Sequence, residues 1–264
     1  PSIMNNSVLK VVILSVGITI VNLVFTTSIY AQDRKFKFGL AAGPSINWLK
    51  IKTEGLESDK TTVSFNYGLY ADFKLEGNDN YYISSGIMIQ SYNYNLNYAS
   101  AILNTASTLT ASSVENDLGL SYLEIPLGVK MRSDEIGYSH IAGWFGFGTG
   151  FRINSSQNKT ESWSEAGSVK SIETKINDVK ALSQGAKLSL KIGGEWERKI
   201  TGETFFVLGC TFENGLTNIL KGESYAVNSN GKTDLPQTNA VLDKTGEGYM
   251  ALPRSIVIHL GVYF

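Results

Sequence analysis

The stretch 62–75 reads TVSFNYGLYADFKL and alternates between two kinds of side chain. The other positions are mostly small or polar, whereas one set of alternate positions is apolar throughout: Val63, Phe65, Tyr67, Leu69, Ala71, Phe73 and Leu75. Because successive side chains of a β-strand point to opposite sides of a sheet, this pattern predicts a strand with two unlike faces. Its length of about thirteen residues slightly exceeds the ~9–11 residues that a tilted strand needs to cross a bilayer.

The same alternation recurs along the rest of the chain. It predicts further strands at 36–47, 81–98, 122–131, 140–153, 186–197, 206–213 and 255–264. In 81–98 the alternation is weaker, and we place Ile83, Ile87 and Ile89 on the apolar face. With 62–75 included, the sequence predicts eight strands.

The links between these strands alternate in length. Three are short and polar, at 76–80, 133–137 and 199–203. Four are longer and rich in Ser, Thr, Asn and Gly, near 50–61, 99–118, 154–181 and 217–249. An even strand count with short turns at one end and long loops at the other is typical of outer-membrane barrels, whose sheets close because lipid cannot hydrogen-bond a free edge. The predicted fold is all-β: an eight-stranded antiparallel up-and-down transmembrane β-barrel with short periplasmic turns and long extracellular loops.

A soluble β-sandwich or a lipocalin-like barrel would also alternate. Its apolar face would point inward, so its other face should be densely charged. Here only 18% of residues are charged, and the second face mixes Gly, Ser, Thr, Asn and Tyr with a few charges of both signs. The last residues, LGVYF at 260–264, are strand-like and end on an aromatic residue instead of a polar tail. Both features favour the membrane barrel.

Composition excludes several classes of function. Lys and Arg total 23 against 24 Asp and Glu, so the net charge of −1 gives no basic footprint for nucleic acid. The one cysteine, Cys210, excludes an internal disulfide framework and a cysteine-cluster metal site, and we expect it to face lipid. With two histidines in the chain, we expect no metal site and no cofactor.

The N-terminus has the layout of a secretory signal peptide. Residues 11–25, VVILSVGITIVNLVF, follow Lys10 and precede small and polar residues around Ala31. The run is short for a membrane-spanning helix, although an uncleaved anchor is the alternative. We predict a signal peptide at 1–31, with Pro1–Ile3 an upstream artefact before an initiator Met4, and an outer-membrane barrel domain at 32–264.

Three motifs resemble those of the PorT-like family of Bacteroidetes outer-membrane barrels: YLEIPL at 122–127, GFGTGF at 146–151 and ENGLTNI at 213–219. The resemblance extends over 32–264 and implies export to the cell outer membrane, with signal cleavage near Ala31. The name-giving member belongs to the type IX secretion system. The resemblance therefore implies either a role in that pathway or the separate role of a paralogue. The closing Phe264 resembles the terminal aromatic that the barrel-assembly machinery reads as an insertion signal.

An eight-stranded barrel has an interior just wide enough for side chains. The charged residues of the polar faces should therefore form a packed, paired network in the lumen, and the alternative is an ion-conducting path. We expect this lumen polar network to contain Glu124, Lys130, Arg152, Lys187, Lys191, Glu195 and Glu213, with Glu197 beside them. We interpret Gly146, Gly148 and Gly150 as positions that admit bulky lumen neighbours, not as a nucleotide-binding loop.

Catalysis is the remaining question for a barrel of this size, because lipid-modifying enzymes also use eight strands. His140 and His259 are the candidate bases, but both are predicted near the periplasmic end, away from the outer leaflet. We expect no catalytic residues. Tyr92, Tyr94 and Tyr98 favour an interfacial girdle or a strand above the membrane over a sugar-binding stretch.

The predicted function is a non-enzymatic scaffold or interaction protein of the envelope. The alternatives are a lipid-modifying enzyme and a small-solute channel. The expected partners are the lipid bilayer and lipopolysaccharide of the outer membrane, the barrel-assembly machinery, and secretion-system or envelope proteins, for a monomeric barrel that binds no nucleic acid. The loops near 154–181 and 217–249 are the expected contact surfaces.

Overall fold

A computed structural model describes residues 36–52, 56–58, 60–103, 109–177, 183–221 and 250–264. The predicted signal peptide at 1–31 and most of the predicted loop at 217–249 lie outside these ranges. Within them, no helix has the length and hydropathy of a membrane span.

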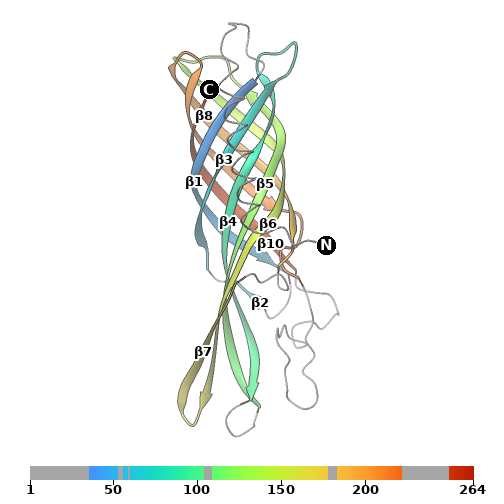
Figure 1. The fold of residues 1–264 in the computed structure, drawn as a ribbon, viewed down its shortest axis with the longest axis vertical. Coiled ribbons are helices and arrows are strands. Elements are labelled where there is room, and N and C mark those ends of the chain that lie inside the picture. The colour runs from blue at the N-terminus through green and yellow to red at the C-terminus, as the bar shows by residue number, and fades with distance from the viewer. Residues whose placement is uncertain (1–35, 53–55, 59, 104–108, 178–182, 222–249) are drawn as a thin grey trace, which may run out of the picture. The chain divides into compact units, whose positions relative to one another are not determined.

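Eight antiparallel strands close into a ring (Figure 1). They are β1 (Phe36–Ile51), β3 (Thr62–Lys74), β4 (Tyr81–Leu103), β5 (Leu109–Arg132), β6 (Ser139–Glu165), β8 (Ala186–Thr201), β9 (Thr204–Gly215) and β10 (Ala251–Tyr263). β1 pairs with β3 and β10, each other strand pairs with its neighbour in the series, and the β4–β5 pairing completes the circuit. Two further strands, β2 (Leu56–Glu57) and β7 (Ser168–Asn177), pair outside the ring with β4 and β6. The predicted fold class is confirmed.

The ring has its apolar side chains on the outside and its polar side chains within. On β3, Val63 and Phe65 are 66% and 56% exposed, whereas Ser64 and Asn66, which alternate with them, are buried. The predicted facing of the third strand is confirmed, since Ile87 is exposed and its neighbour Met88 is buried. This arrangement suits a barrel in lipid and excludes the soluble alternatives, whose apolar side chains gather in a central core.

The short predicted turns lie together at one end of the ring. They join β3 to β4, β5 to β6 and β8 to β9, and this end also holds the start of β1 and the end of β10. By the rule for outer-membrane barrels, this is the periplasmic end.

At the other end, two predicted loops are mostly strand. β4 and β5 stay paired as far as Leu103 and Leu109, so only residues 104–108 of the predicted 99–118 loop lie between them, outside the described residues. Most of the 154–181 loop is a hairpin of β6 and β7 joined at Ala166 and Gly167, whose φ values of 51° and 78° suit a two-residue turn. Figure 1 shows these strands continuing beyond the ring, and we call this four-stranded part of β4–β7 the projection.

Candidate functional site: the filled lumen and the projection

The lumen near the periplasmic end holds an ion cluster centred on Lys130 of β5, which we call the lower cluster. The Lys130 ammonium lies 3.0 Å from a carboxylate oxygen of Asp72, 2.6 Å from Glu195 and 2.8 Å from Glu197. Glu197 also contacts the Nε of Arg132 at 2.8 Å. Because unpaired charge in a barrel interior is costly, one lysine shared by three carboxylates requires a further cation nearby, which Arg132 supplies.

A second ion cluster, the upper cluster, lies nearer the extracellular end. Lys187 of β8 is 2.6 Å from a carboxylate oxygen of Glu124 and 2.5 Å from one of Glu213. Lys191 pairs with Glu124 and lies 3.5 Å from Glu213. The Tyr92 hydroxyl donates to Glu213. Two lysines and two glutamates make this group neutral, and all four are at most 4% exposed.

Glycines of β6 make room for these ions, as the sequence predicts. A Cβ on Gly148 would lie 2.7 Å from Lys191 Cε and 2.9 Å from Glu124 Cδ, and a Cβ on Gly150 would lie 2.8 Å from Lys187 Cε. Gly146 differs from this prediction, because the atoms nearest to its Cβ would be backbone atoms of β5, with the Leu127 carbonyl oxygen at 2.4 Å, and not a bulky lumen side chain. Glycine at positions 148 and 150 is therefore a steric requirement of the charged lumen, and glycine at 146 is a requirement of close strand packing.

Arg152 is the one predicted network member that the structure places elsewhere. Its guanidinium donates to the backbone carbonyl and the hydroxyl of Ser183, not to a carboxylate. Arg152 lies where β6 leaves the ring, and the segment before β8 crosses to meet it there. Residues 183–185 lie between the predicted 154–181 loop and the predicted strand at 186–197, so no pattern in the sequence anticipates this partner.

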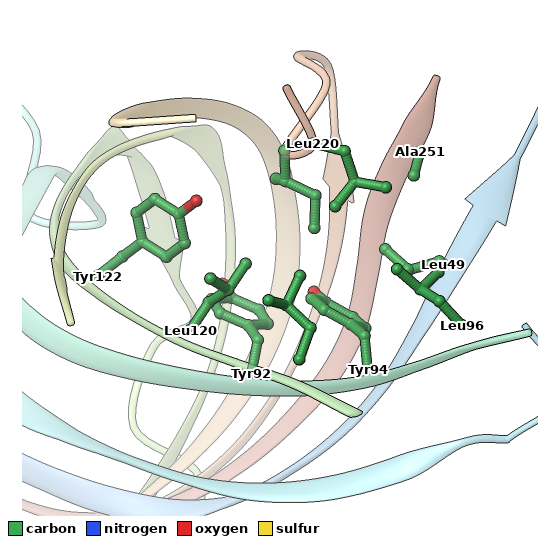
Figure 2. Close-up of a cluster of buried hydrophobic side chains, with 10 residues drawn as sticks. Leu49, Tyr92, Tyr94, Leu96, Leu120, Tyr122, Leu220 and Ala251 are labelled. Atoms are coloured by element: carbon green, nitrogen blue, oxygen red, sulfur yellow. The ribbon is translucent and has the colours of Figure 1, made fainter. Parts of the chain in front are cut away.

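Apolar and tyrosine side chains fill the extracellular mouth of the ring. This mouth cluster consists of Leu49, Tyr92, Tyr94, Leu96, Leu118, Leu120, Tyr122, Ile219, Leu220 and Ala251. Figure 2 shows Tyr92 and Tyr94 of β4 next to each other, with Leu220 reaching toward the group from the segment after β9. The backbone holds that segment in place, since Gln184 N–H donates to the Ile219 carbonyl and Ile219 N–H to the Ala251 carbonyl.

The tyrosines of β4 lie on a strand that continues beyond the ring, which is one of the two predicted placements, and the other placement, the interfacial girdle, is wrong. Tyr92 and Tyr94 are each 2% exposed and face the interior, so they do not form an interfacial girdle. They occupy the mouth because the inward face of β4 continues in register from Met88 through Gln90. Aromatic residues also serve as interior packing, so composition could not distinguish the two roles.

The two histidines lie toward the periplasmic end, as predicted. His259 Nε2 is 3.3 Å from a carboxylate oxygen of Glu195, and His140 Nδ1 is 3.0 Å from the backbone carbonyl of Ser133. In the described part of the chain, both rings thus contact structural groups and not a serine hydroxyl. Those ranges likewise hold no group of three His, Cys, Asp or Glu side chains arranged to bind a metal ion. Cys210 is exposed on the outer face, which confirms its predicted facing.

The projection carries polar side chains on the face that continues the outside of the ring. Asn95 Nδ2 donates to Glu115 at 3.1 Å and to Asp117 at 2.7 Å. Lys60 pairs with Glu115, and its hydrogen bond lowers the pKa of that carboxyl below the ordinary value. Lys175 has the same effect on the pKa of Glu173 in β7. The projection is thus a charged, solvent-facing sheet and not a further membrane-spanning part.

A family model described as an outer membrane protein beta-barrel domain matches residues 30–221. No curated protein matches the chain. Similar solved structures include Ail, the attachment invasion locus protein of Yersinia pestis, at 15% identity and a TM-score of 0.35, covering 87% of this chain and 99% of that chain. OprG from Pseudomonas aeruginosa is 9% identical with a TM-score of 0.34, covering 86% and 95%. The protease OmpT from Escherichia coli is 8% identical with a TM-score of 0.36, covering 90% and 99%.

Proposed function

The chain belongs to the outer membrane protein beta-barrel domain family, and from this premise we propose that it is a non-enzymatic, non-conducting barrel that presents its projection to other components of the cell envelope. The family places the protein in the outer membrane. The narrower role is argued from the lumen and from the strands beyond it.

The filled lumen is the observation that carries the proposal. The lower cluster, the upper cluster and the mouth cluster occupy successive levels of the ring, and Tyr92 belongs to both of the last two. Eight strands enclose a space that side chains can fill, and these side chains are paired or packed. This supports a structural interior over a solute path. The position of His140 and His259 near the periplasmic end supports the same conclusion against a lipid-modifying enzyme.

The projection is the part best suited to contact a partner. Among the described strands, β7 pairs with β6 alone, so its other edge offers free backbone N–H and C=O groups. An exposed strand edge can accept an extended segment of another protein as an added strand. One face of β7 also presents apolar side chains to a partner, since Ile172 is 51% exposed and Ile176 is 44% exposed. We propose an extended segment of an envelope protein as the partner of this edge.

Two measurements test the proposal. Purified barrel in planar bilayers should give no stepwise conductance, and regular single-channel steps would contradict it. Affinity purification from detergent-solubilised outer membranes should recover a partner with the natural chain and lose it with Ile172→Asp/Ile176→Asp. Val169→Asp, on the opposite face of the same strand, is the matched control. Equal recovery by the natural chain and the double variant would remove β7 from the proposal.

The link to type IX secretion is a narrower hypothesis supported by motif resemblance at 122–127, 146–151 and 213–219. Deletion of the gene should then block export of proteins that carry a C-terminal targeting domain, and normal export would exclude the link.

We also propose that residues 1–31 are removed, so the N-terminal sequence of the mature protein should begin at Gln32. We further propose that the barrel is a monomer held by lipid and lipopolysaccharide, with Phe264 as its assembly signal.

A further inference from the structure

The outer face of the ring changes from apolar to polar along a sharp line. On β5 the outward side chains run from Met131 through Leu123 as an apolar series and then become Ser121, Gly119, Asp117 and Glu115. β4 changes at the same level, because Ile89 pairs with Leu123 and Ser91 pairs with Ser121. The change marks where the hydrocarbon ends on this side of the barrel.

A cavity of about 450 Å³ opens on this face just beyond the line. It lies over Gly119, which pairs with Asn93 of β4 and Ser156 of β6. Gly119 is four residues beyond Leu123, or about 13 Å along the strand at ~3.3 Å per residue. The strand tilt shortens this height above the hydrocarbon, so the cavity lies at the level of the lipid headgroups.

The cavity is lined by hydroxyl and amide side chains with one charge of each sign. Asn93, Ser156 and Asn158 supply neutral donors and acceptors, and Asp117 and Lys175 supply the charges. Asp117 pairs with Asn158, which pairs in turn with Lys175, so the three form one row across β5, β6 and β7. The Asn158 amide oxygen is buried without a hydrogen-bond partner. A buried acceptor without a partner is costly, and a ligand that donates a hydrogen bond would satisfy it.

These features together select the chemistry of a ligand. Neighbouring hydroxyls of a sugar both donate and accept, which matches alternating amide, hydroxyl and carboxylate groups. A phosphate or sulfate would call for several cations, and here Lys175 is offset by Asp117. The volume falls within the roughly 300–1,000 Å³ of small-molecule sites. In an outer membrane, the molecules whose sugars lie at this level are the lipopolysaccharides of the outer leaflet.

We propose that this cavity binds a neutral saccharide unit of the lipopolysaccharide that surrounds the barrel. The site faces away from the barrel axis and needs neither the free edge of β7 nor a protein partner. It rests on the proposed association with lipopolysaccharide and deepens it, because it names the cavity and the part of the lipid that binds there.

The test uses the full barrel refolded in detergent micelles, with binding followed by titration calorimetry. The probes are lipopolysaccharide with its core sugars, lipid A without core sugars, and free core oligosaccharide. We expect lipopolysaccharide to bind at least tenfold more tightly than lipid A. Binding of the free oligosaccharide would show that the sugar alone suffices. If the free oligosaccharide does not bind while lipopolysaccharide binds tightly, the site takes only membrane-anchored sugar.

Two variants locate the site. Asn158→Ala and Asp117→Ala should each weaken lipopolysaccharide binding at least tenfold, whereas Thr160→Ala should not, because it lies two residues from Asn158 on the same face and outside the lining. Unchanged heat-modifiable migration in gels would show that each variant folds. Equal affinity for lipid A and lipopolysaccharide, or unchanged binding by both cavity variants, would overturn the proposal. Partner recovery through β7 should be the same in all three variants, which separates this test from that of the proposed function.

Discussion

Removing the Lys187 ammonium should destabilise the barrel far more than removing the partly exposed ammonium of Lys199 near the end of the same strand. Lys187 is 1% exposed and contacts Glu124 at 2.6 Å and Glu213 at 2.5 Å. In Lys187→Met, two buried carboxylates would share Lys191 alone, and breaking a buried ion pair in this way costs ~3–5 kcal/mol. Lys199→Met is the matched control, because Lys199 is 33% exposed and 3.9 Å from Glu203, and such pairs contribute ~0–1 kcal/mol.

The measurement is equilibrium urea unfolding of barrels refolded into lipid vesicles, followed by tryptophan fluorescence. The double variant Lys187→Met/Glu213→Gln removes one charge of each sign, so it should recover at least ~1 kcal/mol relative to Lys187→Met alone. If Lys187→Met costs no more than Lys199→Met, or if the double variant loses the sum of the two single losses, the lumen is not held by paired charge and the reasoning fails.

Three other substitutions test separate features. Ile192→Arg, on the lipid face between the two ends of β8, should lower the free energy of unfolding in vesicles by ~2–4 kcal/mol. Val169→Arg in the projection should change it by less than ~0.5 kcal/mol. Similar losses in the two variants would contradict the assigned membrane level. Gly146→Ala places a Cβ 2.4 Å from a backbone carbonyl oxygen and should lower the free energy of unfolding in urea by ~1–3 kcal/mol. Gly143→Ala, whose Cβ would have its nearest contact at 3.9 Å, should be tolerated. Equal stability of the two variants would show that the strands can separate at little cost. Phe264→Ala should reduce the amount of barrel in isolated outer membranes and Phe264→Tyr should preserve it, so normal yield of the alanine variant would exclude the assembly-signal role.

The membrane-spanning strands could be predicted because lipid forces hydrophobicity into the two-residue period of a strand. Val63 and Ser64 differ in environment as sharply as they differ in polarity. Beyond the hydrocarbon, the polarity of a side chain no longer depends on the face it occupies, since both faces of β6 and β7 meet water or polar groups. The period then carries no signal, and the paired strands of the projection read as loop.

The lumen was only partly predictable for a related reason. The facing of Lys187 and Glu213 followed from alternation, but their partners depend on how strands pair across the ring. The mouth cluster was missed because Ile219 and Leu220 belong to no alternating segment. Their burial is set by backbone hydrogen bonds from Ile219 to Ala251 and from Gln184 to Ile219, which no local pattern encodes.

The interior ion pairs constrain how the barrel enters the membrane. Lys130 is joined to Glu195 across 65 residues, and Lys187 to Glu124 across 63. An N-terminal half-barrel inserted by itself would carry Glu124 into hydrocarbon before its counter-ions Lys187 and Lys191 arrive from β8. Such an intermediate would have a high free energy, because it would hold an unpaired charge in hydrocarbon. Strand-by-strand insertion is therefore disfavoured, and β3 to β9 should assemble at the membrane surface and enter together.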